Sequence, residues 1–337
     1  MSTAASSPSN RRRVLILAHT GRDEASKIAA EFARAIVAEG LAVRVVEEDA
    51  PALERWGLPE AEVVAVDPCA GEGCEIAVVF GGDGTLLRAA ELVRECGTPL
   101  VGVNLGHVGF LAEADVDDLD HTVRRVVDRE YTVEERMTVD ARVFVDDQEV
   151  ARSWALNEAA VEKASRERML EVVVAIDDRP VSRWGCDGIV CATPTGSTAY
   201  NFSAGGPVVW PEVQALLMVP ISAHALFARP MVVSPTSLLA IQVIPDAPAS
   251  GVLWCDGRRT YDLPPGARVE VRQGEKHIRL ARLHQAPFTD RLVRKFDLPV
   301  TGWRGAAAQR MSEGRDRRPD DSAERSADRS ADRPEEG

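Results

Sequence analysis

Hydrophobic residues follow two different patterns along this chain, and the pattern changes near residue 130. Before it, short apolar runs have the length of buried strands: Val14–Ala18, Leu41–Val46, Ile76–Phe80 and Leu100–Val103. Apolar residues at helical spacing predict helices over three segments: Asp23–Glu39, Thr85–Cys96 and Asp117–Asp128. Strands that alternate with helices are typical of a parallel sheet with right-handed crossovers. Residues 13–130 are therefore predicted to form an α/β domain.

From residue 131 the pattern becomes that of antiparallel strands. Three segments alternate in polarity or are β-branched: Val139–Val145, Leu170–Ile176 and Val269–Val271. Turn pairs follow them and favour hairpins: Asp146–Asp147, Asp177–Asp178 and Gln273–Gly274. A helical insert is expected near Thr195–Ala204. Residues 131–304 are predicted to form a β-rich domain, so the fold class is an α/β domain followed by a β domain.

The two ends of the chain and one internal stretch lack such patterns. Residues 1–12 are rich in Ser and Ala, and residues 305–337 include three Ser-Ala-acid-Arg repeats, at residues 322–333. Both are predicted to be disordered, because they bury too little apolar surface to offset the entropy of ordering. The acidic stretch 47–73 is left without an assigned element. Asp23 is expected to cap the first helix, and Gly40 to end it.

Composition narrows the class of protein. The 337 residues are 45% hydrophobic and 28% charged, which is the usual globular mixture. The net charge of −13 argues against non-specific nucleic-acid binding, although a few local donors suffice for a phosphate ligand. No apolar run approaches a membrane span or a signal-peptide core, so no membrane partner is expected. The six Cys form no CxxC pair, which favours reduced thiols and a cytoplasmic location.

Residues 81–85 read Gly-Gly-Asp-Gly-Thr, directly between a predicted strand and a predicted helix. Glycines let backbone N–H groups approach an anion, and a helix start adds partial positive charge. Asp83 is unexpected there, because a carboxylate repels phosphate. It could hold Mg²⁺, or it could accept a proton from an attacking hydroxyl. A glycine turn whose Asp caps the helix is the structural alternative.

Three of the four Asn residues of the chain stand in distinctive strings. Asn104 lies in Gly102–Phe110, beyond a strand end, where α/β sheets bind ligands. Asn157 precedes Glu158. Asn201 lies in Thr193–Gly206, a string rich in hydroxyls and glycines that could bind a polar ligand, with Tyr200 stacking on a planar ring. A well-capped helix explains the last string equally well.

With these motifs the sequence resembles the NAD kinase family, from about Val14 to Trp303. The Gly-Gly-Asp-Gly-Thr loop alone also resembles that of phosphofructokinases and lipid kinases, whereas the three motifs in this order are specific. The segment Ala286–Phe296 resembles actinobacterial members. The resemblance implies phosphorylation of the adenosine-ribose 2′-hydroxyl of NAD to give NADP, with ATP or inorganic polyphosphate as donor and a divalent cation, Mg²⁺ or Mn²⁺.

The resemblance also implies roles for individual residues. Asp83 would be the catalytic proton acceptor, and Gly82 and Gly84 would lie along the diphosphate. Asn157 and Glu158 would bind hydroxyls or the nicotinamide amide. Thr198, Ala199, Tyr200 and Ser203 would form the walls of the adenine and ribose pocket, and Asn201 and Phe202 are further candidate binding residues in the same string. Position 201 varies in the family.

Asp187 would reach the ligand of a neighbouring subunit, which implies a homodimer or homotetramer. Arg88 and Arg168 stand at variable family positions, where an anion contact and a solvated surface position are both consistent with the sequence. His19 could face the phosphate donor or be a loop residue without a role. No protein-held metal site is predicted.

The sequence is compatible with two other functions. A lipid or sugar kinase would use the same glycine loop but would not need Asn157-Glu158 or the Thr193–Gly206 string. A non-catalytic NAD(P)-binding regulator would bind without turnover, and it would have no use for the carboxylate of Asp83.

Overall fold

The computed structural model of the protein describes residues 11–105, 109–112, 114–115, 119–246, 249–284 and 287–300. The chain divides into two compact units, Met1–Phe288 and Thr289–Gly337. The predicted α/β domain, residues 13–130, and residues 131–288 of the predicted β-rich domain lie in the first unit, and α6 (Phe288–Phe296) begins at the last residue of that unit. The segments predicted to be disordered lie outside the described residues, except for Arg11 and Arg12. Arg12 is held by an ion pair with Glu75 at 2.7 Å.

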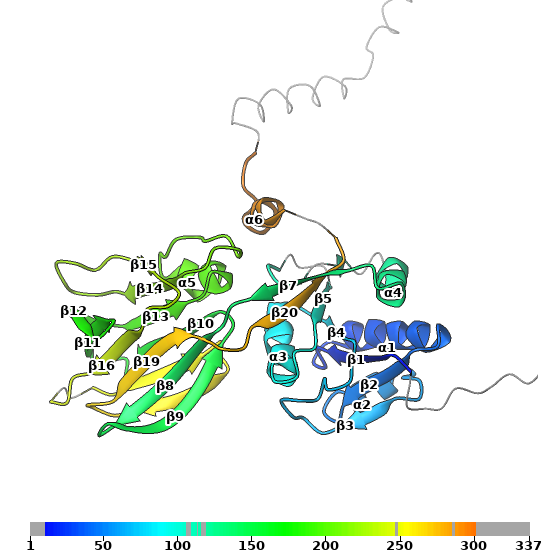
Figure 1. Ribbon diagram of the computed structural model, residues 1–337, viewed down its shortest axis with the longest axis horizontal. Coiled ribbons are helices and arrows are strands. Elements are labelled where there is room, and N and C mark those ends of the chain that lie inside the picture. Colours follow the sequence, from blue (N-terminus) through cyan, green and yellow to red (C-terminus); the bar gives the residue numbers. More distant parts are fainter. Residues whose placement is uncertain are drawn as a thin grey trace, which may run out of the picture. The chain divides into compact units, whose positions relative to one another are not determined.

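An eight-stranded sheet forms the first domain, in the order β3-β2-β1-β4-β5-β20-β7 with β6 beside β5 (Figure 1). The pairings from β3 to β5 are parallel, and β7 is antiparallel to β20. The strands are β1 (Arg13–Ala18), β2 (Ala42–Val46), β3 (Glu62–Val64), β4 (Ile76–Phe80), β5 (Leu100–Asn104), β6 (Ala114–Asp115), β7 (Thr132–Arg136) and β20 (Ile278–Arg282). The predicted parallel α/β domain is confirmed.

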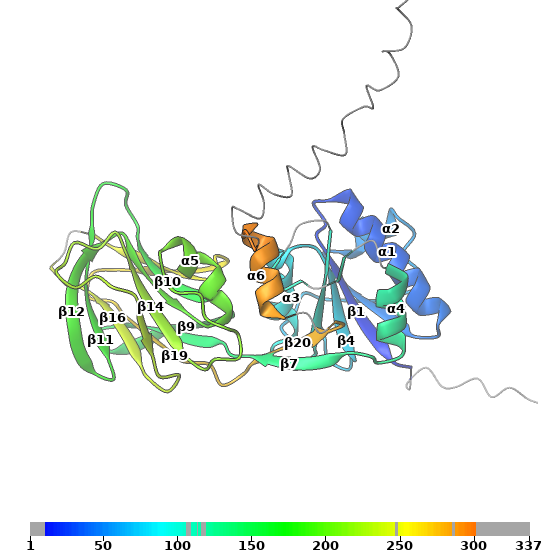
Figure 2. The ribbon, with the colours of Figure 1, turned by 90° about the horizontal axis from the view of Figure 1, so that it is seen from above.

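Helices cover both faces of this sheet (Figure 2). The apolar side chains of α1 (Asp23–Ala38), α2 (Ala50–Glu54) and α4 (Leu119–Val127) pack on one face, and those of α3 (Asp83–Val93) on the other. Alternate residues of β1 therefore enter different cores, Val14 and Ile16 on the first face and Leu15 and Leu17 on the second. Because both faces are buried, the strands read as continuous apolar runs.

Three local predictions differ from the structure. Asp23 is the first residue of α1, and the cap position is Arg22, which makes no side-chain cap hydrogen bond. The carboxylate still suits the positive end of the helix dipole. The predicted helix 85–96 instead spans Asp83–Val93, so it includes Asp83 itself. The stretch 47–73 contains α2 and β3, which are too short to show a period.

Two six-stranded antiparallel sheets form the second domain. The first has the order β15-β14-β13-β10-β17-β18: β15 (Met231–Val233), β14 (Leu216–Ile221), β13 (Gly188–Ala192), β10 (Glu158–Lys163), β17 (Gly251–Cys255) and β18 (Arg259–Leu263). The second has the order β12-β11-β16-β19-β8-β9: β12 (Arg179–Cys186), β11 (Leu170–Ile176), β16 (Leu239–Val243), β19 (Arg268–Gln273), β8 (Val139–Val145) and β9 (Gln148–Ala155). One core takes residues from both sheets, which confirms the β-rich domain.

The turns of this domain explain its hairpins. Asp146–Asp147 and Asp177–Asp178 have φ values from 51° to 61°, the left-handed conformation that two-residue hairpin turns require. Gln273–Gly274 makes no hairpin, because β19 and β20 belong to different sheets. The predicted helical insert is present as a 3₁₀ turn at Thr195–Thr198 and α5 (Tyr200–Ser203).

The first sheet also contains two strands from the predicted β-rich domain, β7 and β20. β7 and β20 pair with each other and extend that sheet, although both lie within residues 131–304. The second domain is thus inserted between two strands of the first, which a single boundary at residue 130 does not describe. Within the described part of the chain, no helix is both long and apolar enough to cross a bilayer.

Candidate active site

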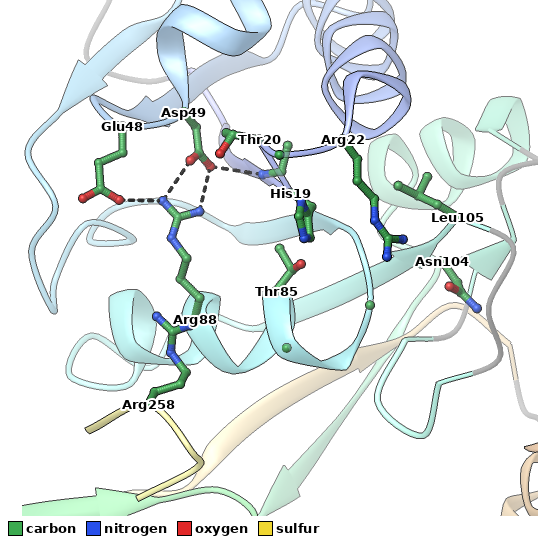
Figure 3. A pocket seen from close by; sticks show the side chains of 14 residues that line it. His19, Thr20, Arg22, Glu48, Asp49, Thr85, Arg88, Asn104, Leu105 and Arg258 are labelled. Carbon is green, nitrogen blue, oxygen red and sulfur yellow. Dashed lines mark hydrogen bonds and ion pairs between the residues drawn. The ribbon is translucent and has the colours of Figure 1, made fainter. Parts of the chain in front are cut away.

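A cavity of about 520 Å³ opens beyond the carboxyl ends of β1, β2, β4 and β5 (Figure 3). The carboxyl ends of parallel strands meet at one edge of a sheet, and ligands of such sheets bind there. The cavity walls come from the loops after these strands, from α3 and from one turn of the second domain: Ala18, His19, Thr20, Gly21, Arg22, Glu48, Asp49, Gly82, Gly84, Thr85, Arg88, Asn104, Leu105 and Arg258. His19 and Asn104, which the sequence singled out, therefore line it.

The glycine loop leaves open space on the cavity side. A Cβ atom added at Gly82 or Gly84 would meet no atom within 4 Å. Gly82 is the N-cap of α3, so the first N–H groups of this helix have no helical acceptor. Free N–H groups at a helix start favour anions. This part of the wall can therefore bind a phosphate group.

Arg88 reaches the cavity from α3 but is already paired. Its guanidinium donates to both carboxylate oxygens of Asp49, at 2.8 and 3.2 Å, and to Glu48 at 3.1 Å. Asp49 is fully buried and also accepts the N–H of Ala18 at 3.1 Å. Sequence reasoning missed Asp49 because it lies in the unassigned stretch 47–73. The pair fixes the loop after β2 to α3.

The carboxylate of Asp83 contacts the loop that follows β5. Its two carboxylate oxygens accept the N–H groups of Phe110 and Leu111, each at 3.1 Å. A Cβ atom added at Gly109 would come within 2.4 Å of the same carboxylate. Asp83 is thus held in one orientation by residues 109–111. Each carboxylate oxygen keeps a second lone pair, which is what a proton acceptor needs.

Asn157 and Glu158 are positioned by Asp256, a residue that sequence reasoning missed. The buried carboxylate of Asp256 accepts the backbone N–H of Leu156 at 2.9 Å and of Asn157 at 2.7 Å. The carbonyl of Asn157 accepts the N–H of Thr193 at 2.9 Å. The second and third motifs therefore touch. The signal available in the sequence was the Asp256-Gly257 turn pair between two strands.

Glu158 carries the polar group that best indicates a ligand. Its side chain is buried, and its Oε2 has no hydrogen-bond partner among the described residues. Burial, with the nearby Asp256, raises the pKa of Glu158 to about 8, and the backbone N–H of Tyr200 opposes this shift. A buried unsatisfied oxygen costs about 1–3 kcal/mol, so a site that leaves one open is built for a partner. At pH 7 this carboxyl is mainly protonated.

The Thr193–Gly206 string divides into structural and accessible residues. Asn201 is fully buried, and its amide donates to the carbonyls of Ser197 at 3.0 Å and Pro207 at 3.1 Å. The amide nitrogen of Asn201 therefore closes the turn, while its Oδ1 has no hydrogen-bond partner among the described residues. The other candidate binding residues of the string are half-buried or exposed: Thr198, Ala199, Tyr200, Phe202 and Ser203.

Two other predicted residues lie elsewhere on the second domain. Asp187, between β12 and β13, forms an ion pair with Lys163 at 2.6 Å, and the hydrogen bond from Lys163 lowers its pKa. Its side chain is 42% exposed, so it remains accessible to a second subunit. Arg168 lies in the exposed turn between β10 and β11 and is not among the residues that line the cavity.

Glu91, on α3, connects this helix to the turn that carries Asp256. It accepts a hydrogen bond from Arg258 at 3.1 Å and forms an ion pair with Arg259 at 3.2 Å, and Arg259 also donates to Asp256 at 3.0 Å. Arg258 lines the cavity. These contacts place the cavity wall and the support of Asn157-Glu158 in one ion-pair network.

The described residues include no cluster of three or more His, Cys, Asp or Glu side chains that could hold a metal ion. Both oxygens of Asp83 already accept backbone N–H groups. Cys186 and Cys191 are buried, and burial raises the pKa of each thiol to about 12.

Comparison with known proteins identifies the family. Residues 14–131 match the ATP-NAD kinase N-terminal domain, and residues 156–283 match the ATP-NAD kinase C-terminal domain. The chain belongs to the NAD kinase family. NAD kinase 2 of Streptomyces avermitilis is 64% identical over 88% of this chain and 97% of its own. The NAD kinase of Thermobifida fusca is 58% identical over 89% of this chain and 94% of its own.

Solved structures of NAD kinases share the fold. An NAD kinase from Archaeoglobus fulgidus in complex with ATP is similar with a TM-score of 0.63 and 25% identity, over 84% of this chain and 98% of that one. Yeast NADH kinase complexed with NADH gives a TM-score of 0.73 at 22% identity, over 86% of this chain and 89% of that one. The predicted family, fold class and enzyme class, NAD kinase, are thus confirmed.

Proposed function

We propose that this NAD kinase transfers a phosphoryl group from ATP or inorganic polyphosphate to the adenosine-ribose 2′-hydroxyl of NAD, giving NADP. The observation that carries the proposal is the arrangement of two half-sites. An open glycine loop faces a cavity in the first domain, and a buried carboxyl oxygen without a partner lies in the second. We place the enzyme in the cytoplasm, since its thiols are free.

The first half-site suits phosphate groups. Gly82 and Gly84 have no Cβ in the way, and Arg22 and Arg258 line the same cavity. Arg88 belongs to this half-site as well, with its charge balanced by Asp49. Catalysis of phosphoryl transfer depends mainly on positioning and charge stabilisation. We assign the N–H groups of the loop to the diphosphate and the arginines to the donor phosphates.

The second half-site suits a nucleoside. We assign Asn157 and Glu158 to ribose or nicotinamide polar groups, and Thr198, Ala199, Tyr200, Phe202 and Ser203 to the walls around adenine and ribose. A neutral Glu158 can donate its proton to a ribose oxygen or accept from a hydroxyl. Asp83 would then take the proton of the 2′-hydroxyl as this oxygen bonds to phosphorus and the bond to the leaving phosphate breaks.

The divalent cation, Mg²⁺ or Mn²⁺, is assigned to the donor as a substrate component. Mg²⁺ is usually held by substrate phosphates with one or two carboxylates, and not by a complete protein cage.

The test of function is NADP formation by the purified full chain. ATP with Mg²⁺, polyphosphate with Mg²⁺, and each with Mn²⁺ are supplied with NAD, and NADP is measured by an enzymatic cycling assay. We expect product with both donors, because the sequence contains no Gly-Lys pair and hence no Walker A loop shaped to a nucleoside triphosphate. Turnover with ATP alone would contradict broad donor use. Phosphorylation of diacylglycerol or fructose 6-phosphate without NADP formation would overturn the function.

Two glycine substitutions separate the phosphate cradle from the scaffold. In Gly196→Ala the new Cβ would lie 2.0 Å from the carbonyl oxygen of Asn157, so we expect about 1–3 kcal/mol of destabilisation and a raised KM for NAD. In Gly84→Ala the Cβ meets only open space, and the helix gains up to about 1 kcal/mol. We expect unchanged or higher thermal stability with at least about tenfold lower kcat/KM. Differential scanning calorimetry with steady-state kinetics checks both. Equal loss of stability in the two variants would contradict this division.

We propose that the active form is a homodimer or homotetramer in which Asp187 contributes to a neighbouring site. Asp187 is half-exposed and fixed by Lys163, and the hairpin edges of the second domain need cover. Light scattering should give a multiple of 36.5 kDa. In Asp187→Ala we expect the same assembly with a higher KM for NAD. A fully active particle of monomer mass would rule this out.

A further inference from the structure

Three aromatic rings from distant parts of the chain form one cluster beside Asp83. Phe288 packs against Phe110, with ring centroids 5.9 Å apart, and against Trp210, at 5.2 Å with an interplanar angle of 66°. Phe288 is the last residue of the first compact unit. Aromatic pairs at such distances contribute beyond the area they bury. The function described above gives this cluster no role.

Phe110 connects the aromatic cluster to the carboxylate of Asp83. The N–H groups of Phe110 and Leu111 hold its two oxygens at 3.1 Å each. Leu111 and Ala112 are buried in the first domain, but the ring of Phe110 is only half-buried. Phe288 therefore packs against a half-buried side chain in the segment whose backbone holds the carboxylate of Asp83.

Trp210 connects the aromatic cluster to the nucleoside half-site. Trp210 follows Val209, whose backbone N–H and carbonyl both bond the hydroxyl of Ser197, at 2.9 and 3.0 Å. Ser197 belongs to the same string as Thr198 and Tyr200. The indole is 43% exposed, so it is not held by a core of its own. The ring of Phe288 thus joins the loop that orients Asp83 to the loop that carries the pocket walls.

From this contact chain we infer that Phe288 is a positioning residue for phosphoryl transfer. It sets the distance between Asp83 and the ribose by holding Phe110 and Trp210 against a common ring. The inference rests on the proposed function, in which Asp83 is the general base. Displacement of a catalytic group by about 1 Å can cost about 100-fold in rate. Phe288 touches no reacting atom in this scheme and acts only through the two loops.

The test compares Phe288→Ala with Phe288→Tyr and with Phe144→Ala. Phe144 lies on β8 and contacts Arg268, so its truncation removes a phenyl ring outside the cluster. We expect kcat to fall about 10- to 100-fold in Phe288→Ala, with the KM for ATP within twofold of wild type. Phe288→Tyr should keep kcat within threefold, and Phe144→Ala should leave it unchanged.

Two further readouts separate positioning from general damage. If Phe288 acts through Asp83, its truncation changes kcat less than twofold in an Asp83→Asn background. Hydrogen exchange at the Phe110 and Leu111 amides should quicken at least threefold in Phe288→Ala, whether or not the wild type makes NADP. Absence of NADP in the wild type would therefore refute the proposed function alone. Unchanged exchange, or an equal loss of kcat in both backgrounds, would overturn the positioning role.

Discussion

Replacing Asp83 by Asn is expected to lower turnover by at least about 100-fold, while NAD affinity stays the same or tightens. A sugar hydroxyl is a weak nucleophile, and a positioned base contributes about 10²–10⁴ in rate, or about 3–5.5 kcal/mol of barrier. Asn has the volume of Asp but no basicity, and it removes a negative charge that repels phosphate. The measurement is kcat and the dissociation constant of NAD at fixed Mg²⁺.

The local geometry adds a second consequence of the same substitution. The two oxygens of Asp83 accept two different N–H groups, and the amide nitrogen of Asn can accept neither. We therefore expect about 1 kcal/mol of lost stability as well. Asp67→Asn is the matched control, since Asp67 accepts the N–H of Cys69 at 2.7 Å in an exposed turn. It should keep turnover within twofold.

Mg²⁺ distinguishes the two roles available to Asp83. If this carboxylate helps to hold the donor-bound cation, a higher Mg²⁺ concentration should partly restore the Asn variant. Loss of a base is not restored in this way. Turnover near that of wild type at ordinary Mg²⁺ would remove Asp83 from the chemistry, and the glycine loop would then be a binding element alone.

The sequence was most informative where a function depends on neighbouring residues. The loop of residues 81–85 could be placed between a strand and a helix because its strand, β4, is a short apolar run with glycines directly after it. Asn157-Glu158 and the string after Thr193 were found as separate motifs. Their contact, in which Asn157 accepts the N–H of Thr193, follows from the pairing of β10 with β13 and not from any local pattern.

Residues that act across long separations were missed for the same reason. Asp256 lies 100 residues from Leu156, yet its carboxylate fixes the backbone there. Asp49 reaches Arg88 across 39 residues. At Asn201 a polar string does not show what the side chain contacts. The structure shows that the residue is buried and that its amide nitrogen closes a turn by donating to the carbonyl of Ser197.

The hydrophobic pattern also did not predict that β20, near the end of the described chain, joins the first sheet. β20 pairs with β5 at one position and with β7 along its length, and these partners lie about 180 and 145 residues earlier in the chain. A strand pattern gives the faces of a strand, but it does not give its neighbours. Ion pairs between Glu91 and the turn after Asp256 then bring the two halves of the site together.

Glu158→Gln is expected to separate the stability of the ligand-free enzyme from its affinity for NAD. Burial raises the pKa of Glu158 from 4.5 to about 8, so the folded chain retains a proton that the unfolded chain releases between these values. The unfolded state therefore binds fewer protons, and the free energy of unfolding falls as pH rises from about 4.5 to 8. This loss of unfolding free energy is absent below pH 4.5 and complete above pH 8. Each unit by which the pKa of Glu158 is raised contributes at most about 1.4 kcal/mol to the loss.

Gln cannot ionise, so this pH dependence should disappear from the variant. Relative to wild type we expect Glu158→Gln to be equally stable near pH 5 and more stable by about 1–3 kcal/mol near pH 8.5, measured by urea unfolding without ligand. Its oxygen accepts the N–H of Tyr200, which leaves the pocket an NH₂ that donates but cannot accept. The KM for NAD should therefore rise about tenfold. Glu167→Gln, in the exposed turn after β10, should change neither quantity. Parallel stability curves for wild type and Glu158→Gln from pH 5 to 8.5 would show that Glu158 is ionised throughout, and its role as a neutral donor to the ribose would then fail.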